Sequence, residues 1–352
     1  MNLYEDSVID DLLVRGEQAR QKRSHKRRRL KPDEVPDNTN LRLETQPQQD
    51  TSSSNWFKEM ISYPCTKRLS LMESFTLWSA ILLYLPIGLF VLLNPGNSLI
   101  PVMKDNNIYT TGYQRICGIH TIIVAFLCVI FSRAIGSNSI KGVILGTILI
   151  RTVYASACLY LLYIRQYIPI SILYITLAID AGLSFITFIL WFYQNPEASL
   201  KQYFKAIWQL INPSSCPLHS SSNVVQVLGF IQCILGMFFF IFPNIALLVF
   251  QINPKNIHGY SKGWLSIGFM SSAAIGFIHA LSGGVDSKSY NIAVISYRII
   301  YSIPVVTCLG LWGQIPSALG LYYVSLDGIC AFVTFIVLYR ESLTSSQKIN
   351  MN

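Results

Sequence analysis

The sequence predicts an all-α membrane protein with eight transmembrane helices, arranged as two parallel four-helix repeats. Three observations predict this class. Hydrophobic residues make up 52% of the 352 residues and charged residues only 13%, about half the charged share of soluble domains. Eight apolar segments follow residue 68, each near the roughly 20 residues that span a bilayer. Polar motifs within these segments recur 147 residues later in the chain.

The recurring positions carry residue types that chance similarity between apolar helices does not reproduce. The pairs at this offset are Gly112 and Gly259, Tyr113 and Tyr260, Arg115 and Lys262, Arg151 and Arg298, Tyr154 and Tyr301, Pro169 and Pro316, and Asp180 and Asp327. Leu and Ile recur in any membrane helix, whereas Gly-Tyr, Arg, Pro and Asp in one register indicate duplication. An even number of helices per unit gives both repeats the same orientation, so we expect a pseudo-two-fold axis along the membrane normal.

Residues 1–68 are predicted to form a mostly disordered, basic cytosolic tail. They hold 13 of the 27 Lys and Arg residues and 11 of the 18 acids, and their middle is rich in Gln, Thr, Ser, Asn, Asp and Pro. Such a composition cannot bury a core. The basic run at 22–31 favours a positive-inside determinant or a contact with anionic lipid over binding of nucleic acid.

The remaining chain divides into two membrane repeats and a linker. The first repeat is residues 69–193, with spans at 72–93, 112–132, 142–163 and 170–191. The second repeat is residues 223–340, with spans at 225–250, 261–281, 291–311 and 317–338, and 341–352 form a C-terminal tail. Residues 194–222 form a cytosolic linker, in which 201–211 alternate basic and aromatic residues like an interfacial helix. The Lys and Arg distribution, which the tail dominates, favours both termini in the cytosol; we expect an internal membrane.

Two intramembrane ion pairs are predicted within the repeats. Arg151 and Asp180 lie at similar depths on consecutive spans, and Arg298 and Asp327 repeat the arrangement. An unpaired charge at mid-bilayer costs at least roughly 2.5–3.5 kcal/mol, so pairing across each helical hairpin is expected. Tyr154 and Tyr301 follow the two arginines by one helical turn and are candidates to hydrogen-bond the carboxylates. The pairs are interpreted either as structural clasps or as a polar site for a substrate, a proton or a ligand.

A second duplicated motif is predicted to bind an anion or a lipid phosphate. Its residues are Gly112, Tyr113 and Arg115 in the first repeat and Gly259, Tyr260 and Lys262 in the second. Each motif begins a span at the outer side, where a cation and the free N–H groups of a first helical turn together suit an anion. Snorkelling anchors of the membrane interface are the alternative.

The sequence predicts no catalytic residue, metal site or cofactor. It contains neither an H-E-x-x-H metal motif nor a P-loop. We therefore expect a non-enzymatic membrane protein with a scaffold or lipid-binding accessory role. Its expected partners are the bilayer, anionic lipid head groups, and membrane or cytosolic proteins, but not nucleic acid. The alternative is a transporter or channel-like protein with a polar site at the repeat interface.

Overall fold

The computed structural model describes residues 69–95, 107–133, 138–195, 198–212, 220–257, 260–285 and 287–350. All of them belong to one unit, residues 53–352. The predicted tail at 1–68, with its basic run, lies outside the described residues. The described part of the chain consists of helices and turns and contains no strand.

The first half of the described chain contains four membrane spans. The first is one continuous helix made of α3 (Leu71–Ser79), the π turn η1 (Ala80–Tyr84) and α4 (Leu85–Leu93). The others are α5 (Ile108–Arg133), the helix α6–η4–α7 (Asn138–Leu149, Ile150–Ala155 and Ser156–Ile164) and α8 (Ile170–Gln194). The helix α3 begins at a capping box, because Ser70 and Glu73 each bond the other's backbone N–H.

The second half contains four further spans, preceded by α9 (Leu200–Ile211). The spans are α10 (Ser220–Ile241), α12 (Ser261–Gly283), the helix α13–η7–α14 (Lys288–Tyr297, Arg298–Ser302 and Ile303–Leu311) and α15 (Ser317–Asn350). The short α11 (Pro243–Val249) and η6 (Pro254–Asn256) join α10 to α12. Eight described helices are therefore long and apolar enough to cross a bilayer, and the chain is a multi-pass integral membrane protein.

The largest differences from the predicted boundaries are at the ends of the fifth and the last span. The fifth span was expected to run to residue 250, but α10 ends at Ile241 and α11 begins at Pro243. Proline has no N–H to donate and therefore interrupts the helix. The last span was expected to end near 338, but α15 continues to Asn350, so the C-terminal tail is largely helical.

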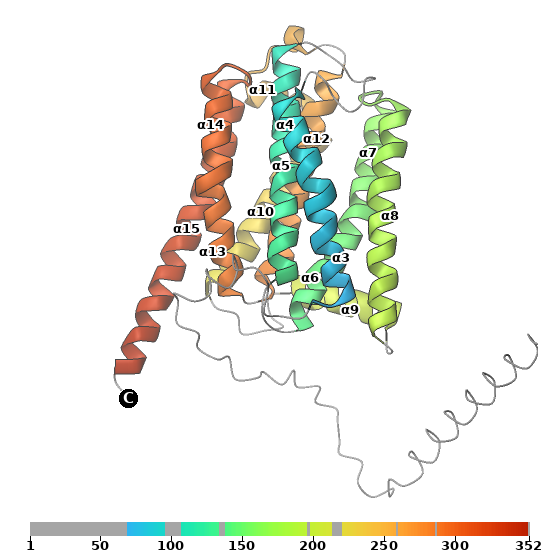
Figure 1. The fold of residues 1–352 in the computed structure, drawn as a ribbon. Coiled ribbons are helices and arrows are strands. Elements are labelled where there is room, and N and C mark those ends of the chain that lie inside the picture. The colour runs from blue at the N-terminus through green and yellow to red at the C-terminus, as the bar shows by residue number, and fades with distance from the viewer. Residues whose placement is uncertain are drawn as a thin grey trace, which may run out of the picture. The chain divides into compact units, whose positions relative to one another are not determined.

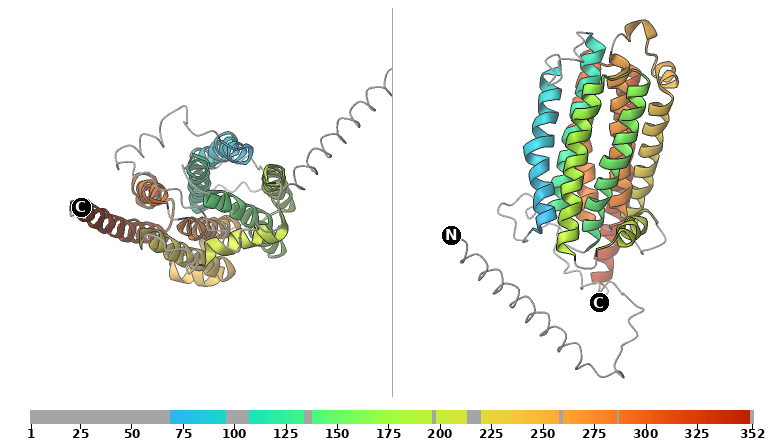
Figure 2. Two further views of the ribbon diagram at one scale, coloured as in Figure 1. Left: turned by 90° about the horizontal axis from the view of Figure 1, so that it is seen from below. Right: turned by 90° about the vertical axis from the view of Figure 1, so that its right-hand side faces the viewer.

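The helices α5 and α12 occupy the centre of the bundle and contact each other (Figures 1 and 2). Each also contacts helices of the opposite half of the chain: α12 contacts α6, η4 and α7, and α5 contacts α13. The spans α5 and α12 are the most buried, and α3–α4 and α8 are the least. The large apolar side chains on these outer helices are available to lipid. Figure 1 also separates two ends of the bundle, which we call the α9 end and the α11 end.

Close helix packing joins α10 to α12 through glycines. A Cβ atom on Gly236 would lie 2.7 Å from the backbone nitrogen of Ala273, and one on Gly229 would lie 2.5 Å from that of Ala280. These distances leave no space for a side chain. Small residues of this kind let membrane helices approach closely and gain van der Waals contact.

Several backbone features occur twice at the offset found in the sequence. The turns after α7 and α14 place Gln166 at φ 57° and Gly313 at φ 66°, which are 147 residues apart. The N–H of Tyr167 bonds the carbonyl of Leu162 at 2.9 Å, and the N–H of Gln314 bonds that of Leu309 at 3.0 Å. The π turns η4 and η7 also coincide at this offset. These backbone features therefore recur at the same offset as the sequence motifs.

Candidate functional site

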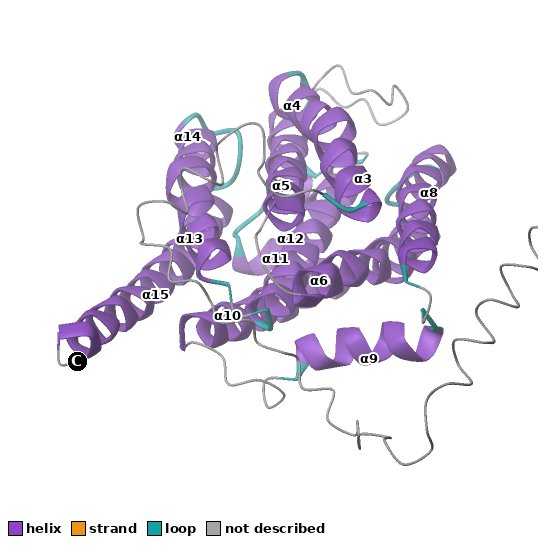
Figure 3. Ribbon diagram, turned by 60° about the horizontal axis from the view of Figure 1, so that its bottom comes forward, coloured by secondary structure: helices purple, strands orange, loops and turns teal. Residues whose placement is uncertain are grey.

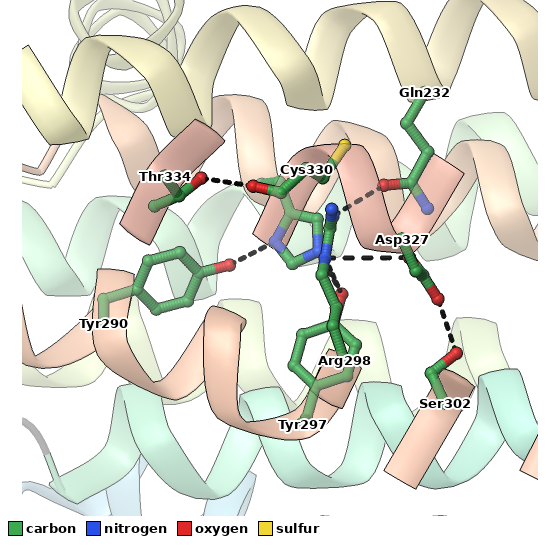
Figure 4. A network of polar contacts seen from close by, with 9 residues as sticks. Gln232, Tyr290, Tyr297, Arg298, Ser302, Asp327, Cys330 and Thr334 are labelled. Atoms are coloured by element: carbon green, nitrogen blue, oxygen red, sulfur yellow. Dashed lines mark hydrogen bonds and ion pairs between the residues drawn. The ribbon is translucent and has the colours of Figure 1, made fainter. Parts of the chain in front are cut away.

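The second half of the bundle encloses a polar network around Arg298 and Asp327 (Figure 4). Arg298 Nε lies 3.7 Å from Asp327 Oδ1, and the two side chains are only 2% and 12% exposed. Arg298 also donates through Nη2 to Gln232 Oε1 at 3.0 Å, and Ser302 donates to Asp327 Oδ2 at 2.5 Å. The ion pair is the contact that the sequence predicts for these residues, and the network embeds it between α10, η7 and α15.

The same network continues through a histidine and two tyrosines. His279 Nδ1 lies 2.6 Å from the Tyr290 hydroxyl, and its Nε2 lies 2.6 Å from the Tyr297 hydroxyl. Arg298 Nε donates to the same Tyr297 hydroxyl at 3.1 Å. His279 on α12 is thereby connected to the ion pair on α15. Hydrogen bonds of this kind offset the cost of burying charge, and they fix the helices in one arrangement.

In the first half, the buried charges of Arg151 and Asp180 are stabilised by different contacts. The direct Arg151–Asp180 ion pair that the sequence predicts is replaced by a chain through Tyr84 of η1. The Arg151 guanidinium carbon lies 4.9 Å from the Tyr84 ring centroid, and the Tyr84 hydroxyl donates to Asp180 Oδ1 at 2.7 Å. A cation–π contact and a charge-assisted hydrogen bond thus stabilise both charges through one side chain. Arg151 also donates to Cys128 Sγ at 3.8 Å.

The two repeat-equivalent tyrosines do not bond the carboxylates as the sequence predicts. The Tyr154 hydroxyl donates instead to the carbonyl of Met270 on α12 at 2.8 Å, which links the two halves. The Tyr301 hydroxyl is buried without a hydrogen-bond partner in the structure. The reason is the π turn that follows each arginine, because it changes the angular spacing of an ideal α-helix on which the prediction relied.

All three π turns of the described spans carry a residue of these two clusters. Tyr84 lies in η1, Arg151 in η4 and Arg298 in η7. A π turn disturbs the regular helical ladder, and in lipid the released backbone groups must find other partners. The Ser156 hydroxyl donates to the carbonyl of Arg151 at 3.4 Å. Such turns frequently occur at functional sites.

The first of the two predicted anion-binding motifs is closed. Because α5 begins at Ile108, Gly112 and Arg115 lie beyond its first turn, away from the free N–H groups that the prediction required. Arg115 donates to the carbonyl of Leu92 at 3.2 Å and bonds Gln314. Tyr113 is only 1% exposed, and Gly112 packs directly against the backbone of Gln314. This motif therefore joins two halves of the bundle, with two of the five N–H donors of Arg115 bonded in the contact.

The second motif is arranged differently around Lys262, in the first turn of α12. Its Nζ lies 4.9 Å from the Tyr167 ring centroid and donates to Asn244 Oδ1 at 3.1 Å. Tyr167 and Gln314 are related by the same 147 residues as Arg115 and Lys262, so each cation meets the turn of the opposite half. Tyr260 is half-buried directly before α12, and Gly259 lies outside the described residues.

A cavity of about 530 Å³ opens beside Lys262 at the α11 end. Its lining includes Asn244 and Tyr167, the two contacts of Lys262, and the full set is Arg165, Tyr167, Ile241, Phe242, Pro243, Asn244 and Ile245. Arg165 donates to the carbonyls of Phe240 and Ile241 at 3.3 and 3.2 Å, which satisfies the C-terminal end of α10. Two of its five N–H donors are used in this way.

The chemistry of this cavity suits an amphiphilic anion. Arg165 lines the cavity, and Lys262 supplies a second cation beside it through its contacts with the lining residues Tyr167 and Asn244. The opposite wall is apolar, with Ile241, Phe242 and Ile245 between 39% and 49% exposed. Charged N–H donors bind phosphate oxygens strongly, while apolar side chains accommodate a hydrocarbon chain.

Two signatures of catalytic chemistry can be checked in the described part of the chain. No group of three or more His, Cys, Asp or Glu there is placed to hold a metal ion. A G-x-S-x-G pattern was expected to be absent, but residues 259–263 match this hydrolase pattern. It requires an exposed serine at a strand-to-helix turn. Ser261 is instead fully buried, bonds Thr110 and begins a membrane helix.

Comparison of the chain with known protein families, curated proteins and solved structures found no match.

Proposed function

We propose that the protein is a non-enzymatic membrane protein that binds a phosphate-bearing lipid in the cavity at the α11 end, in a scaffold or accessory role. The observation that carries the proposal is the cavity of about 530 Å³ lined by Arg165 and by the two contacts of Lys262. Its volume lies within the range of about 300–1,000 Å³ common for ligand sites.

The difference between the two repeats favours this site over its counterpart. The cavity lies beside Lys262 and is lined by its two contacts, whereas Arg115 bonds Leu92 and Gln314 in the packed contact between the halves. Lys262 is held by an aromatic ring and one amide oxygen, and a third N–H of its ammonium group remains for an anion.

Native mass spectrometry tests the proposal directly. The protein is released from its own membrane, and bound lipid is identified by its mass. Wild type should retain a phosphate-bearing lipid at a ratio near one, and Arg165→Gln combined with Lys262→Gln should lose most of it. Arg115→Gln is the matched control and should retain the lipid. Retention by the double variant would exclude this cavity, and an adduct with the mass of free phosphate would exclude a lipid as the ligand.

A second candidate function is transport, which the mid-membrane clusters favour. Nη1 of Arg298 is buried without a hydrogen-bond partner in the structure, and π turns accompany both arginines. A transport pathway would admit water to this depth. Gln232→Cys should then react with a membrane-impermeant thiol reagent from one side of the membrane. Protection from both sides would contradict a pathway and leave the clusters as structural clasps.

A further inference from the structure

The helix α9 joins the two halves and lies across the α9 end of the bundle (Figure 3). It begins at Ser199, whose hydroxyl accepts the N–H of Gln202, a preferred N-cap. It follows α8 and precedes α10, and it contacts α6 and α12. The element therefore lies along the level where the membrane spans begin and end.

One face of α9 is fixed against the bundle. Tyr203, Ile207 and Leu210 are between 4% and 5% exposed. The Tyr203 hydroxyl donates to the carbonyl of Leu145 at 3.1 Å, and burial raises the pKa of this hydroxyl to about 12, which keeps it a donor. Gln226 Nε2 donates to the carbonyl of Leu210 at 2.7 Å and satisfies the C-terminal end of the helix. These contacts fix which face of α9 is turned toward the bundle.

A second face of α9 carries an exposed apolar stripe. Leu200, Phe204 and Trp208 are spaced by four residues and therefore lie in one row along the helix. They are 61%, 58% and 65% exposed. Exposing three large apolar side chains in one row to water is unfavourable, at about 25 cal/mol per Å² of apolar surface.

Two lysines flank this stripe on the side away from the bundle. Lys201 and Lys205 follow Leu200 and Phe204 by one residue, and both are exposed. At 100° per residue, the order around the helix is the buried face, the apolar stripe and then the lysines. This order is typical of helices that lie in the plane of a bilayer interface, with aromatic residues in the hydrocarbon boundary and lysines among the head groups.

We propose that α9 is a membrane-binding surface that inserts Leu200, Phe204 and Trp208 into the leaflet at the α9 end and binds anionic lipid head groups through Lys201 and Lys205. The positive charge selects the occupant, because each lysine near an anionic surface gains about 1 kcal/mol, or roughly fivefold in binding. The surface is independent of the cavity, which lies at the opposite end of the bundle.

Tryptophan quenching in the full-length protein tests the insertion. The protein is reconstituted into vesicles of brominated or ordinary phosphatidylcholine, and the emission of wild type is compared with Trp208→Phe. The part of the emission lost in this variant should be quenched by brominated lipid and protected from aqueous acrylamide. Moving the ring one turn, in the variant Phe204→Trp with Trp208→Phe, should restore the quenched component. Quenching by acrylamide and not by brominated lipid would overturn the proposal and indicate a docking surface for a soluble protein.

The selectivity for anionic lipid tests the proposed role of Lys201 and Lys205. In nanodiscs of mixed phosphatidylserine and phosphatidylcholine, the lipids that stay bound on release are counted by mass spectrometry. Lys201→Gln with Lys205→Gln should lower the excess of phosphatidylserine by about 25-fold, because two contributions of roughly fivefold multiply. Lys255→Gln, at the opposite end, should leave it unchanged. An unchanged excess in the α9 variant would overturn the assignment of the lysines to anionic lipid.

Discussion

The sharpest consequence of the polar network concerns the charge on Asp327. In Asp327→Asn the amide keeps the shape and an oxygen that accepts the Ser302 hydrogen bond, but Arg298 loses its counter-charge. The guanidinium has almost no contact with solvent, because the side chain is 2% exposed. Removing one partner of a buried ion pair costs about 3–5 kcal/mol, since the remaining charge is left uncompensated. For a chain of this length the loss corresponds to a drop in Tm on the order of 10 °C.

The matched control is the repeat-equivalent change, Asp180→Asn. Asp180 is half-buried, and it contacts Arg151 only through Tyr84, whose hydroxyl donates to the carboxylate. An amide oxygen accepts the same hydrogen bond, and the cation–π contact of Arg151 is untouched. We expect a cost near that of one weakened hydrogen bond, about 1 kcal/mol. Thermal unfolding of both variants in one detergent, followed by loss of folded monomer, gives the comparison.

The reasoning would be refuted by equal losses of Tm in the two variants, or by no loss in Asp327→Asn. A further variant separates charge from packing. Arg298→Met combined with Asp327→Leu removes both charges, and apolar replacements of buried ion pairs are often neutral or stabilising. Its Tm should lie well above that of Asp327→Asn. A double variant as unstable as the single one would mean that the hydrogen bonds, and not the charge balance, stabilise this region.

Two further predictions concern contacts between helices. Gly112→Ala and Gly263→Ala should each cost about 1–3 kcal/mol of stability, because the new Cβ meets the backbone carbonyl of Gln314 or Tyr167. The control Gly182→Ala, with no neighbouring atom within 4 Å, should be neutral or stabilising by about 0.5–1 kcal/mol. Equal Tm values for all three variants would contradict this packing. Glu341→Gln should weaken the cap on α10 by about 1–2 kcal/mol, since the Glu341 carboxylate accepts hydrogen bonds from the Ser221 N–H at 2.9 Å and from the Ser221 hydroxyl at 2.7 Å. Hydrogen exchange at the Ser221 amide should therefore accelerate in this variant. An unchanged exchange rate would show that the cap does not stabilise α10.

The sequence was sufficient for the number of spans and for the residues that carry charge into the membrane. Apolar length is a direct consequence of bilayer thickness, and the repeated Arg and Asp positions are visible without any structure. The partners of those charges were not predictable in the same way. Tyr84, Gln232 and His279 contribute to the clusters, yet the positions 147 residues away hold Ile231, Leu85 and Ser132, so the repeat gave no signal for them.

The site at the α11 end could not be predicted from the sequence for a related reason. Spacing along one chain segment predicts neighbours within a helix, whereas Arg115 and Lys262 each meet a turn from the other half of the bundle. Arg165, in the turn after α7, lines the cavity because α10 ends early at Ile241. The interruption by Pro243 thus opened a site in one repeat that packing closed in the other.

The most direct test of the proposed lipid site is an electron cryo-microscopy map of the protein in nanodiscs of its native lipids. The account predicts a phosphate head group between Arg165 and Lys262, with an acyl chain along Ile241, Phe242 and Ile245. An occupied cavity in wild type and an empty one in Arg165→Gln with Lys262→Gln would support the assignment. A cavity filled by protein side chains, or a lipid bound there with its head group away from both cations, would contradict it.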